Sequence, residues 1–315
     1  MKAVRIHEYG GPEVLRYEDA PRPEPAEGEV LVCVHAAGVN PVDWKARAGY
    51  LREMMKYPLP LTPGWDFSGT IEAVASGAGS WRTGAEVYAR PDISRNGAYA
   101  EYIAVRASEI AAKPKSLDHI HAAAIPLAAL TAWQALFDAA RLAPGQKILI
   151  HAAAGGVGHF AVQLAKWKGA FVAGTGSAHS REFLEGLGVD QFIDYTSTRF
   201  EDAVRDFDVV LDTVAGETRA RSWGVLKQGG VLVSILGQPS QEEAKAHGVR
   251  SAGIFVQPNP SQLAEIAELV DAGKLKPHLE AVFPLSEAVK AQELSQTLHV
   301  RGKIVLRVVA ANNVR

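Results

Sequence analysis

The chain has 315 residues, with 33 Lys and Arg against 35 Asp and Glu, so its formal net charge is −2. This balance disfavours a protein held to nucleic acid or to an anionic membrane by a large basic surface. Cys33 is the one cysteine, which excludes internal disulfides and cysteine-rich zinc or iron–sulfur sites. No apolar stretch reaches the roughly 18 residues of a membrane helix. Because the first residues carry charges where a signal peptide is apolar, we expect a cytoplasmic, two-domain protein.

Residues 1 to 118 predict a β-rich unit. Short, alternating runs of apolar residues are separated by glycine and proline turns, and they cover 29–40, 67–77, 85–92 and 98–105. Strands at this spacing are typical of a compact, barrel-like unit and not of a parallel sheet.

From residue 119 onward, helical and extended patterns alternate. The predicted helices cover 119–142, 155–169, 179–188 and 217–227. The predicted strands cover 146–153, 170–176, 191–195, 207–213 and 229–236. This rhythm indicates an α/β fold, a doubly wound parallel sheet with helices on both faces, which we assign to residues 119–257.

The last part of the chain changes character again. A helix is predicted from Ser261 or Gln262 to Gly273, and Ser286 can cap another over 287–299. The final predicted strand, 303–309, precedes no further helix. We therefore expect residues 258–315 to return to the N-terminal unit, so that the α/β domain is an insertion.

The strongest local signal is the glycine-rich segment that follows the strand at 146–153. Glycines have no Cβ and let the backbone approach a pyrophosphate, while the N–H groups of the following helix face the phosphates. The residues expected to bind a dinucleotide there are Ala154, Gly155, Gly156, Val157 and Gly158. Ala153 replaces the first glycine of the usual pattern. Glycine-rich turns also join strands to helices for structural reasons alone, but the strand and helix on either side favour nucleotide binding.

The end of the next strand predicts which nicotinamide dinucleotide is bound. An NAD site carries an acidic residue there for the ribose hydroxyls, whereas this chain has Gly176 and Ser177. Arg181 follows in the next helix and Tyr195 ends the following strand, and both can serve a 2′-phosphate. The pattern therefore favours NADPH, although Arg181 could also be an ordinary solvated helix residue.

The motifs taken together resemble those of the zinc-independent quinone oxidoreductases, the zeta-crystallin-like branch of the medium-chain dehydrogenase/reductase superfamily. The matching stretches run from one end of the chain to the other: GVNPVDWKARAG (38–49), PGWDFSGTIEAV (63–74), PLAALTAWQAL (126–136), AAAGGVGHFAVQLAK (152–166), LDTVAGE (211–217) and RGKIVLRV (301–308). The resemblance implies a Rossmann domain inserted into a GroES-like catalytic domain that is built from both ends of the chain.

The zinc-dependent branch of that superfamily differs at the metal ligands. Where its members carry a Cys and a His ligand, this chain has Asn40 and Trp65, and the third ligand position corresponds to Leu127. Asn, Trp and Leu do not make a catalytic zinc site. The ten histidines show no ligand spacing, and His119 and His121 are expected to be solvated or to cap a helix. We therefore predict no metal.

The resemblance also implies roles for individual residues. Asn40, Tyr50 and Thr131 are the expected catalytic residues beside the nicotinamide and the acceptor. Trp44, Lys45, Trp65 and Asp66 are expected to line the acceptor pocket, with Asp66 positioning Lys45 or Trp44. Asp43 is expected to brace the loop. Leu236, Gly237, Arg301 and Lys303 are further candidates for cofactor contacts. Asn40, Asp66 and Thr131 could instead have only structural roles.

The implied reaction is hydride transfer from NADPH to a quinone or to an α,β-unsaturated carbonyl, neither of which requires a metal. Two alternatives remain at this point: an NADPH-binding sensor or structural protein with little turnover, and an enoyl-thioester reductase. A homodimer is also expected, paired through the apolar segment SAGIFVQ (251–257), which could equally be an internal strand.

Overall fold

A computed structural model describes residues 1–308, and residue 309 of the predicted final strand lies outside them. The chain forms two compact units. Unit 1 comprises residues 1–127, 257–273 and the part of the chain from 277 onward, and unit 2 comprises residues 128–256 and 274–276. Within the described residues, no helix combines the length and the apolar character needed to cross a bilayer.

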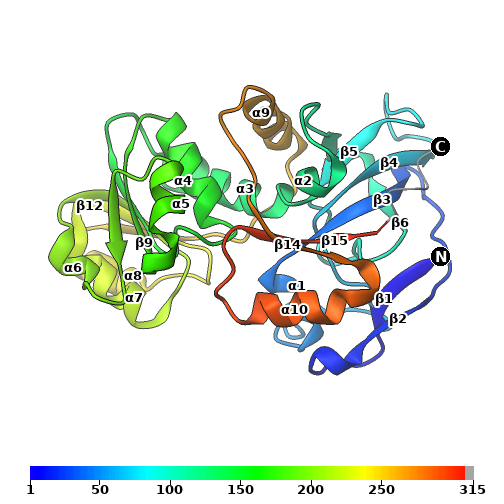
Figure 1. Cartoon of the computed structure of the whole chain (residues 1–315), viewed down its shortest axis with the longest axis horizontal. Coiled ribbons are helices and arrows are strands. Elements are labelled where there is room, and N and C mark those ends of the chain that lie inside the picture. The colour runs from blue at the N-terminus through cyan, green and yellow to red at the C-terminus, as the bar shows by residue number, and fades with distance from the viewer. Residues whose placement is uncertain (309–315) are drawn as a thin grey trace. The chain divides into compact units, whose positions relative to one another are not determined.

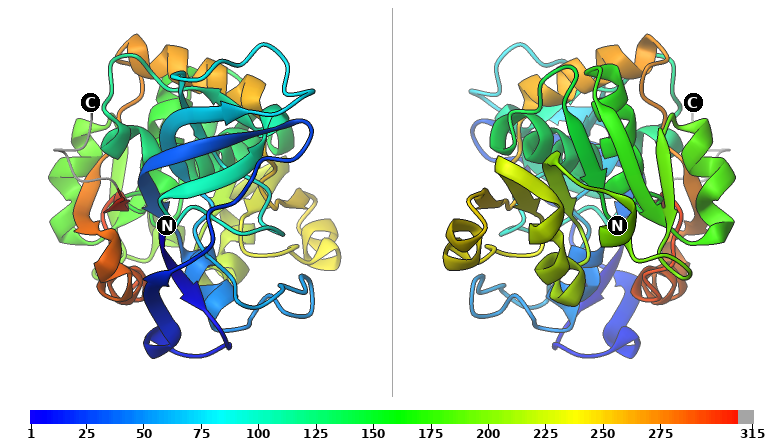
Figure 2. Two further views of the ribbon diagram at one scale, coloured as in Figure 1. Left: turned by 90° about the vertical axis from the view of Figure 1, so that its right-hand side faces the viewer. Right: turned by 90° about the vertical axis from the view of Figure 1, so that its left-hand side faces the viewer.

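Unit 1 is built on a mostly antiparallel sheet (Figure 1, blue and cyan strands, and Figure 2, left). The order β14-β15-β3-β4-β5-β7 is joined by β6, which pairs with β3, and β1 pairs with β2 in a separate ribbon. Their bounds are β1 Lys2–Ile6, β2 Leu15–Asp19, β3 Glu29–Val39, β4 Phe67–Val74, β5 Glu86–Ala89, β6 Tyr102–Arg106, β7 Ile110–Ala112, β14 Leu279–Pro284 and β15 Lys303–Arg307.

The sheet of unit 1 ties the two ends of the chain together. The final strand, β15, runs antiparallel to the long strand β3, with Ile304 opposite Val39 and Leu306 opposite Ala37. These inward side chains are buried together with those of β4, which explains why the return of the chain is stable. The helices of unit 1 are α1 Pro41–Arg47, α2 His119–Ala123, α9 Pro260–Asp271 and α10 Ala288–Gln296, with 3₁₀ turns at Pro12–Val14, Ala107–Glu109 and Leu285–Glu287.

Unit 2 contains a six-stranded parallel sheet (Figure 2, right). Its strands are β8 Lys147–Ile150, β9 Phe171–Gly176, β10 Gln191–Asp194, β11 Phe207–Asp212, β12 Leu226–Ser234 and β13 Arg250–Gly253. The order β10-β9-β8-β11-β12-β13 is the 3-2-1-4-5-6 arrangement of a dinucleotide-binding domain. The order of the strands reverses between β8 and β11: β8, β9 and β10 follow one another toward one edge of the sheet, and β11, β12 and β13 toward the other. Ligands are expected at the carboxyl ends of β8 and β11, where this switch occurs.

Helices cover both faces of this sheet, because the strands are apolar on both sides and must be enclosed. They are α4 Gly158–Trp167, α5 Arg181–Gly186, α6 Phe200–Ala203, α7 Gly216–Ser222 and α8 Gln241–Ala246, with 3₁₀ turns at Ala178–Ser180 and Trp223–Val225. Residues 274–276 belong to this unit because the Gln163 side chain of α4 forms hydrogen bonds with both the N–H and the carbonyl of Lys276, at 2.8 and 3.0 Å.

The predicted helix at 119–142 is interrupted. It consists of α2, then α3 (Pro126–Trp133), then a π-helical turn at Gln134–Ala139. Pro126 has no N–H to continue α2, and α2 packs against β3 and β4. The first boundary between the units therefore falls at residue 127, inside α3, and not at the predicted residue 118.

Candidate functional site

The glycine-rich segment forms a close-packed turn between β8 and α4. A Cβ on Gly158 would lie 2.4 Å from the carbonyl oxygen of Ala152 and 2.7 Å from that of Ala153, so no larger residue fits there. On Gly155 it would lie 3.2 Å from the same Ala152 oxygen. The turn has the close approach of backbone to backbone that pyrophosphate binding requires, and α4 points its N-terminus at it. Gly156, Val157 and Ala154 complete the turn.

Two buried side chains that the sequence did not identify hold this turn. The Thr175 hydroxyl of β9 accepts a hydrogen bond from the N–H of Ala152 at 3.1 Å, and the Thr175 carbonyl accepts one from Ala153 at 2.9 Å. His151, which directly follows β8, lies with its Nε2 2.9 Å from the Ser222 hydroxyl. Burial lowers the pKa of His151 to about 4, so its ring is neutral at physiological pH and adds no charge beneath the phosphates.

The carboxyl ends of β9 and β10 lie side by side, and they bring together the residues predicted to select NADPH. Gly176 ends β9 and is followed by Ser177, while Tyr195 follows β10 and is 54% exposed. The Arg181 guanidinium lies 4.4 Å from the centre of the Phe192 ring of β10, which keeps its positive charge over this edge. Arg181 also contacts Glu185 at 3.4 Å on the surface of α5.

The other predicted cofactor residues of unit 2 are also placed by the structure. Leu236 and Gly237 follow β12, with Gly237 at φ +90. Thr131, which was predicted as a catalytic residue, lies in α3 and is buried.

In unit 1, Asn40 is the centre of a buried polar network. Its Nδ2 donates to the carboxylate of Asp66 at 3.0 Å, and its Oδ1 accepts from the Lys303 ammonium. Lys303 Nζ also donates to Asp66 at 3.3 Å and to the carbonyl of Val39. The second Asp66 oxygen accepts from the N–H of Leu127 at 3.0 Å. Burial raises the pKa of Asp66, and the nearby Lys303 charge opposes that rise.

This network corrects two of the predicted roles. Lys303 is 3% exposed and its ammonium is used inside unit 1, so the structure gives it different partners from the cofactor phosphate predicted for it. Asp66 contacts Asn40 and Lys303, and not Lys45 or Trp44 as predicted, because its fully buried side chain, just before β4, lies inside unit 1. Arg301, the other phosphate candidate of unit 1, lies near Glu280, with its Nε 4.0 Å from that carboxylate.

Asp43 braces the Asn40 loop as predicted. One of its carboxylate oxygens accepts from the N–H of Asn40 at 2.8 Å and from the hydroxyl of Tyr99 at 2.8 Å. The residue is fully buried on α1, and burial raises its pKa to about 7 in spite of these two hydrogen bonds. The sequence contained no signal for Tyr99, which lies 56 residues away.

Of the expected acceptor-pocket residues, Trp44 and Lys45 are half-buried and, with the exposed Tyr50, form the surface group, whereas Trp65 and Asp66 lie in the core. Trp44 and Tyr50 form an edge-to-face pair with ring centres 6.2 Å apart, and the Lys45 ammonium lies 5.5 Å from the centre of the Trp44 ring. Tyr50 is 71% exposed, so its hydroxyl is accessible. Trp65, in contrast, is fully buried and donates its indole N–H to the carbonyl of Arg95, so the structure places it in the core and not on a pocket wall.

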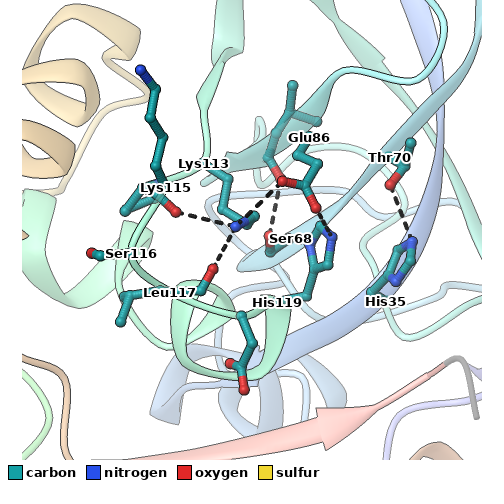
Figure 3. Close-up of polar contacts among 12 residues, drawn as sticks. His35, Ser68, Thr70, Glu86, Lys113, Lys115, Ser116, Leu117 and His119 are labelled. Atoms are coloured by element: carbon teal, nitrogen blue, oxygen red, sulfur yellow. Dashed lines mark hydrogen bonds and ion pairs between the residues drawn. The ribbon is translucent and has the colours of Figure 1, made fainter. Parts of the chain in front are cut away.

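A second polar cluster in unit 1 involves two stacked histidines (Figure 3). The rings of His35 and His119 lie 4.1 Å apart, and His119 contacts the Ser68 hydroxyl at 2.8 Å and Glu86 at 3.0 Å. Burial lowers the pKa of both histidines, that of His119 to about 4. Ser68 is fully buried, and its hydroxyl also donates to the carbonyl of Val87 at 3.0 Å. His119, which was expected to be solvated or to cap a helix, is thus a partly buried structural residue.

Among residues 1–308, no three His, Cys, Asp or Glu side chains gather where they could hold a metal ion. Asn40 and Trp65, at the positions of two zinc ligands in zinc-dependent relatives, form hydrogen bonds with Asp66 and Lys303 and with the carbonyl of Arg95, respectively. The glycine turn of unit 2, where a Cβ added to Gly158 would collide with backbone oxygens, does fit a dinucleotide.

Comparisons with known proteins agree with this architecture. The family model described as alcohol dehydrogenase GroES-like domain matches residues 26–115, and that described as zinc-binding dehydrogenase matches residues 187–306. The mitochondrial NAD(P)H oxidoreductase RTN4IP1 of Mus musculus is 35% identical over 98% of this chain and 89% of its own length. This chain belongs to the medium-chain dehydrogenase/reductase superfamily.

Two further members of the superfamily are informative. The chloroplastic NADPH-dependent alkenal/one oxidoreductase of Arabidopsis thaliana is 35% identical, covering 97% of this chain and 79% of that protein. The structure of the quinone oxidoreductase from Coxiella burnetii has a TM-score of 0.92 and 38% identity, covering 98% of this chain and 99% of that one. The resemblance to the quinone oxidoreductases and the GroES-like and Rossmann fold predicted from the sequence are confirmed.

The cytoplasmic location predicted from the sequence is corrected by the same comparisons. The mouse relative is named mitochondrial and the Arabidopsis relative chloroplastic. These names point away from the cytoplasm, so we withdraw that prediction.

Proposed function

We propose that this protein is an NADPH-dependent reductase that transfers a hydride to quinones or to α,β-unsaturated carbonyl compounds. The observation that carries the proposal is the carboxyl edge of the unit 2 sheet. There, a glycine turn that is too tight for a Cβ at Gly158 adjoins a strand end that bears Gly176 and Ser177 in place of an acid, beside the Arg181 guanidinium. The names of the Arabidopsis and Coxiella relatives support the two acceptor classes.

The residues of unit 2 divide the binding of NADPH between them. The N–H groups of the turn at 155–158 and the N-terminus of α4 bind the pyrophosphate. Ser177, Arg181 and Tyr195 bind the 2′-phosphate, since a guanidinium and hydroxyl groups complement a dianion that an acidic residue would repel. When bound, NADPH supplies the hydride.

The surface group of unit 1 serves the acceptor. The exposed hydroxyl of Tyr50 donates a hydrogen bond to the acceptor carbonyl, and the Trp44 ring provides an apolar wall next to it. Asn40 has a second N–H on Nδ2 beyond the one it gives to Asp66. That N–H is the second donor we assign to the carbonyl oxygen, whose growing negative charge it would stabilise.

We also propose that the reaction is independent of zinc, although one matching family model is described as zinc-binding. The ligand positions carry Asn40, Trp65 and Leu127, whose side chains do not provide the Cys and His donors of a catalytic zinc site. A quinone or an enone carries the developing charge on a conjugated oxygen, so hydrogen-bond donors suffice in place of a Lewis acid.

NADPH absorbance should be followed with a quinone and, separately, with an alkenal, each with and without a zinc chelator. Oxidation of NADPH by either acceptor that the chelator leaves unchanged supports the proposal. Tight NADPH binding without oxidation would identify a sensor or structural protein, and selective oxidation by an enoyl thioester would identify the third class. If Asn40→Ala changes neither kcat nor KM for any acceptor, the role of Asn40 is wrong.

We infer further that two copies of the chain pair through the edge of the unit 2 sheet. β13 hydrogen-bonds to β12 on one side and is the last strand in the sheet order among the described residues. The partly exposed Phe255 lies just beyond it in the apolar segment 251–257. Sedimentation should give the mass of a dimer, and a Phe255→Lys variant that sediments identically as a dimer would rule out this edge.

A further inference from the structure

Arg219 of α7 contacts the ends of two neighbouring strands, β11 and β12, at the carboxyl edge of the unit 2 sheet. Its Nε donates to the carboxylate of Asp212, the last residue of β11, at 2.6 Å. Its Nη2 donates to the hydroxyl of Ser234, the last residue of β12, and to the carbonyl of Leu236, both at 2.8 Å. One guanidinium thus connects the segments that leave two neighbouring strands.

Asp212 fixes the backbone on its own side of this connection. It is fully buried, and its other carboxylate oxygen accepts from the N–H groups of Val214 at 3.1 Å and Ala215 at 2.8 Å. Burial opposes its charge, but the Ala215 N–H and the Arg219 guanidinium keep the pKa of Asp212 below its ordinary value.

Ala215 is held in a strained conformation. Its φ is +67° and its ψ −162°, a region that residues other than glycine rarely adopt. Such a conformation persists only where the surroundings impose it, and it commonly marks a functional segment. Here the surroundings are the hydrogen bond from its N–H to Asp212 and, through Asp212, Arg219.

The two connected segments belong to the half of the sheet that faces the nicotinamide. In a 3-2-1-4-5-6 sheet, the half that starts with the glycine turn takes one mononucleotide and the other half takes the second. β8, β9 and β10 form the adenosine half, which carries Arg181. β11 and β12 therefore form the nicotinamide half.

We propose that Arg219 is a positioning residue for the nicotinamide end of the cofactor, an inference that rests on the proposed function. It keeps residues 213–215 and 235–237 at one spacing, so that their backbone groups present a preformed surface to the nicotinamide. Arginine suits this role because its planar fork donates in two directions at once, whereas a lysine ammonium is a single point.

A matched control lies two residues along the same helix. Arg221 is also partly exposed, but its guanidinium contacts Glu201, at 3.0 Å, away from the ends of β11 and β12. Both Arg219→Met and Arg221→Met remove one charge and one ion pair from α7. Only the first should affect the nicotinamide half.

The test compares NADPH with 2′,5′-ADP, which has the adenosine half alone. For Arg219→Met, we expect NADPH oxidation with a saturating quinone to slow about 10- to 100-fold, because small displacements of a reacting group are costly. The affinity for 2′,5′-ADP should stay within about twofold, and Arg221→Met should change neither value. A loss of 2′,5′-ADP affinity as large as the loss of the NADPH oxidation rate, or no loss in either quantity, would overturn the proposal.

Two further variants keep the result interpretable. If Arg219→Met does not fold, combining it with Asp212→Asn removes the unpaired buried charge, while the oxygen of the introduced amide still accepts from the N–H of Ala215. The double variant should fold and still show the loss selective for NADPH, and full NADPH turnover in it would contradict the role. Failure of the wild type to bind either ligand would refute the proposed function instead.

Discussion

Among residues 1–308, each unit contains one ion pair whose carboxylate is fully buried, and the two pairs differ in what surrounds them. In unit 1, the side chains of Lys303 and Asp66 are 3% and 0% exposed and come from positions 237 residues apart. In unit 2, Arg219 and Asp212 are seven residues apart, and the Arg219 side chain is 18% exposed. The enclosed pair joins the final strand to the core of its unit and also holds the Asn40 side chain, so breaking it is expected to lower stability above all. The partly open pair lies at a sheet edge and orders segments that face a ligand.

This difference indicates how to recognise the function of a buried charge. A pair enclosed on every side is expected to affect stability when it is broken, because removing one partner leaves the other charged and unsolvated. A pair at the edge of a ligand site is expected to affect binding and turnover as well. The following predictions test this distinction, from the largest effect to the smallest.

Lys303→Met should lower the free energy of unfolding by about 3–5 kcal/mol, because it leaves the Asp66 carboxylate buried without its cation. Urea unfolding of the full chain measures the loss. Adding Asp66→Asn should recover much of it, since the amide is neutral. Lys227→Met, which removes a half-exposed lysine that pairs with Asp208, is the control and should cost about 1 kcal/mol or less. Equal losses for the two lysine variants would remove the basis of the comparison.

Gly158→Ala should weaken NADPH binding about 100-fold or more, since the new Cβ would lie 2.4 Å from the Ala152 carbonyl oxygen and push the turn away from the pyrophosphate. Quenching of tryptophan fluorescence measures the affinity. Gly186→Ala is the control, because a Cβ there meets nothing within 4 Å and the residue lies in a helix. It should bind NADPH normally and be about 0.5–1 kcal/mol more stable. Normal binding by Gly158→Ala would refute the pyrophosphate site.

Arg181→Ala should weaken NADPH binding about tenfold, the value of one charge-assisted hydrogen bond, and leave NADH binding unchanged. Equal weakening of both cofactors would mean that Arg181 does not contact the 2′-phosphate. Arg199→Ala is the control, because the Arg199 guanidinium contacts Glu201 on the surface. This variant should bind both cofactors as the wild type does.

Asp43→Asn should leave the free energy of unfolding at low pH nearly unchanged but should alter how that free energy depends on pH. Because burial raises the pKa of Asp43 to about 7, the native state holds this proton and the unfolded state loses it near pH 4. The wild type therefore loses stability through this group as the pH rises from about 4 to about 7.

The Asp43→Asn variant lacks that loss, while its amide oxygen still accepts from Asn40 and Tyr99. Below about pH 4 the two proteins should agree within about 0.5 kcal/mol, and the variant should become increasingly the more stable one as the pH rises from about 4 to about 7. Urea unfolding across this range measures the difference. Parallel pH profiles of the two proteins would show that the pKa of Asp43 is not raised in the native state.

The α/β unit was predictable because its strands are enclosed on both faces. Runs such as ILI at 148–150 and VVL at 209–211 are continuously apolar, and each helix between them ends at a glycine or turn signal. The glycine turn was predictable for a different reason: the absence of a Cβ can be read directly from the residue type.

Contacts between distant positions were not predictable. The sequence shows that Lys303 carries a positive charge suited to a cofactor phosphate, but not that β15 pairs with β3 and carries Lys303 to Asn40. Likewise, Trp65 is aromatic and lies beside a family motif, but its burial follows from packing against Tyr57. Short strands such as β1 and β7 carry too few residues to show a period.

Calorimetric titration with NADPH and with NADH tests the central claim most directly. The edge formed by Ser177, Arg181 and Tyr195 predicts that NADPH binds at least about tenfold more tightly than NADH, with one site per chain and no requirement for added zinc. Equal or tighter binding of NADH, or NADPH binding that appears only when zinc is added, would contradict the account.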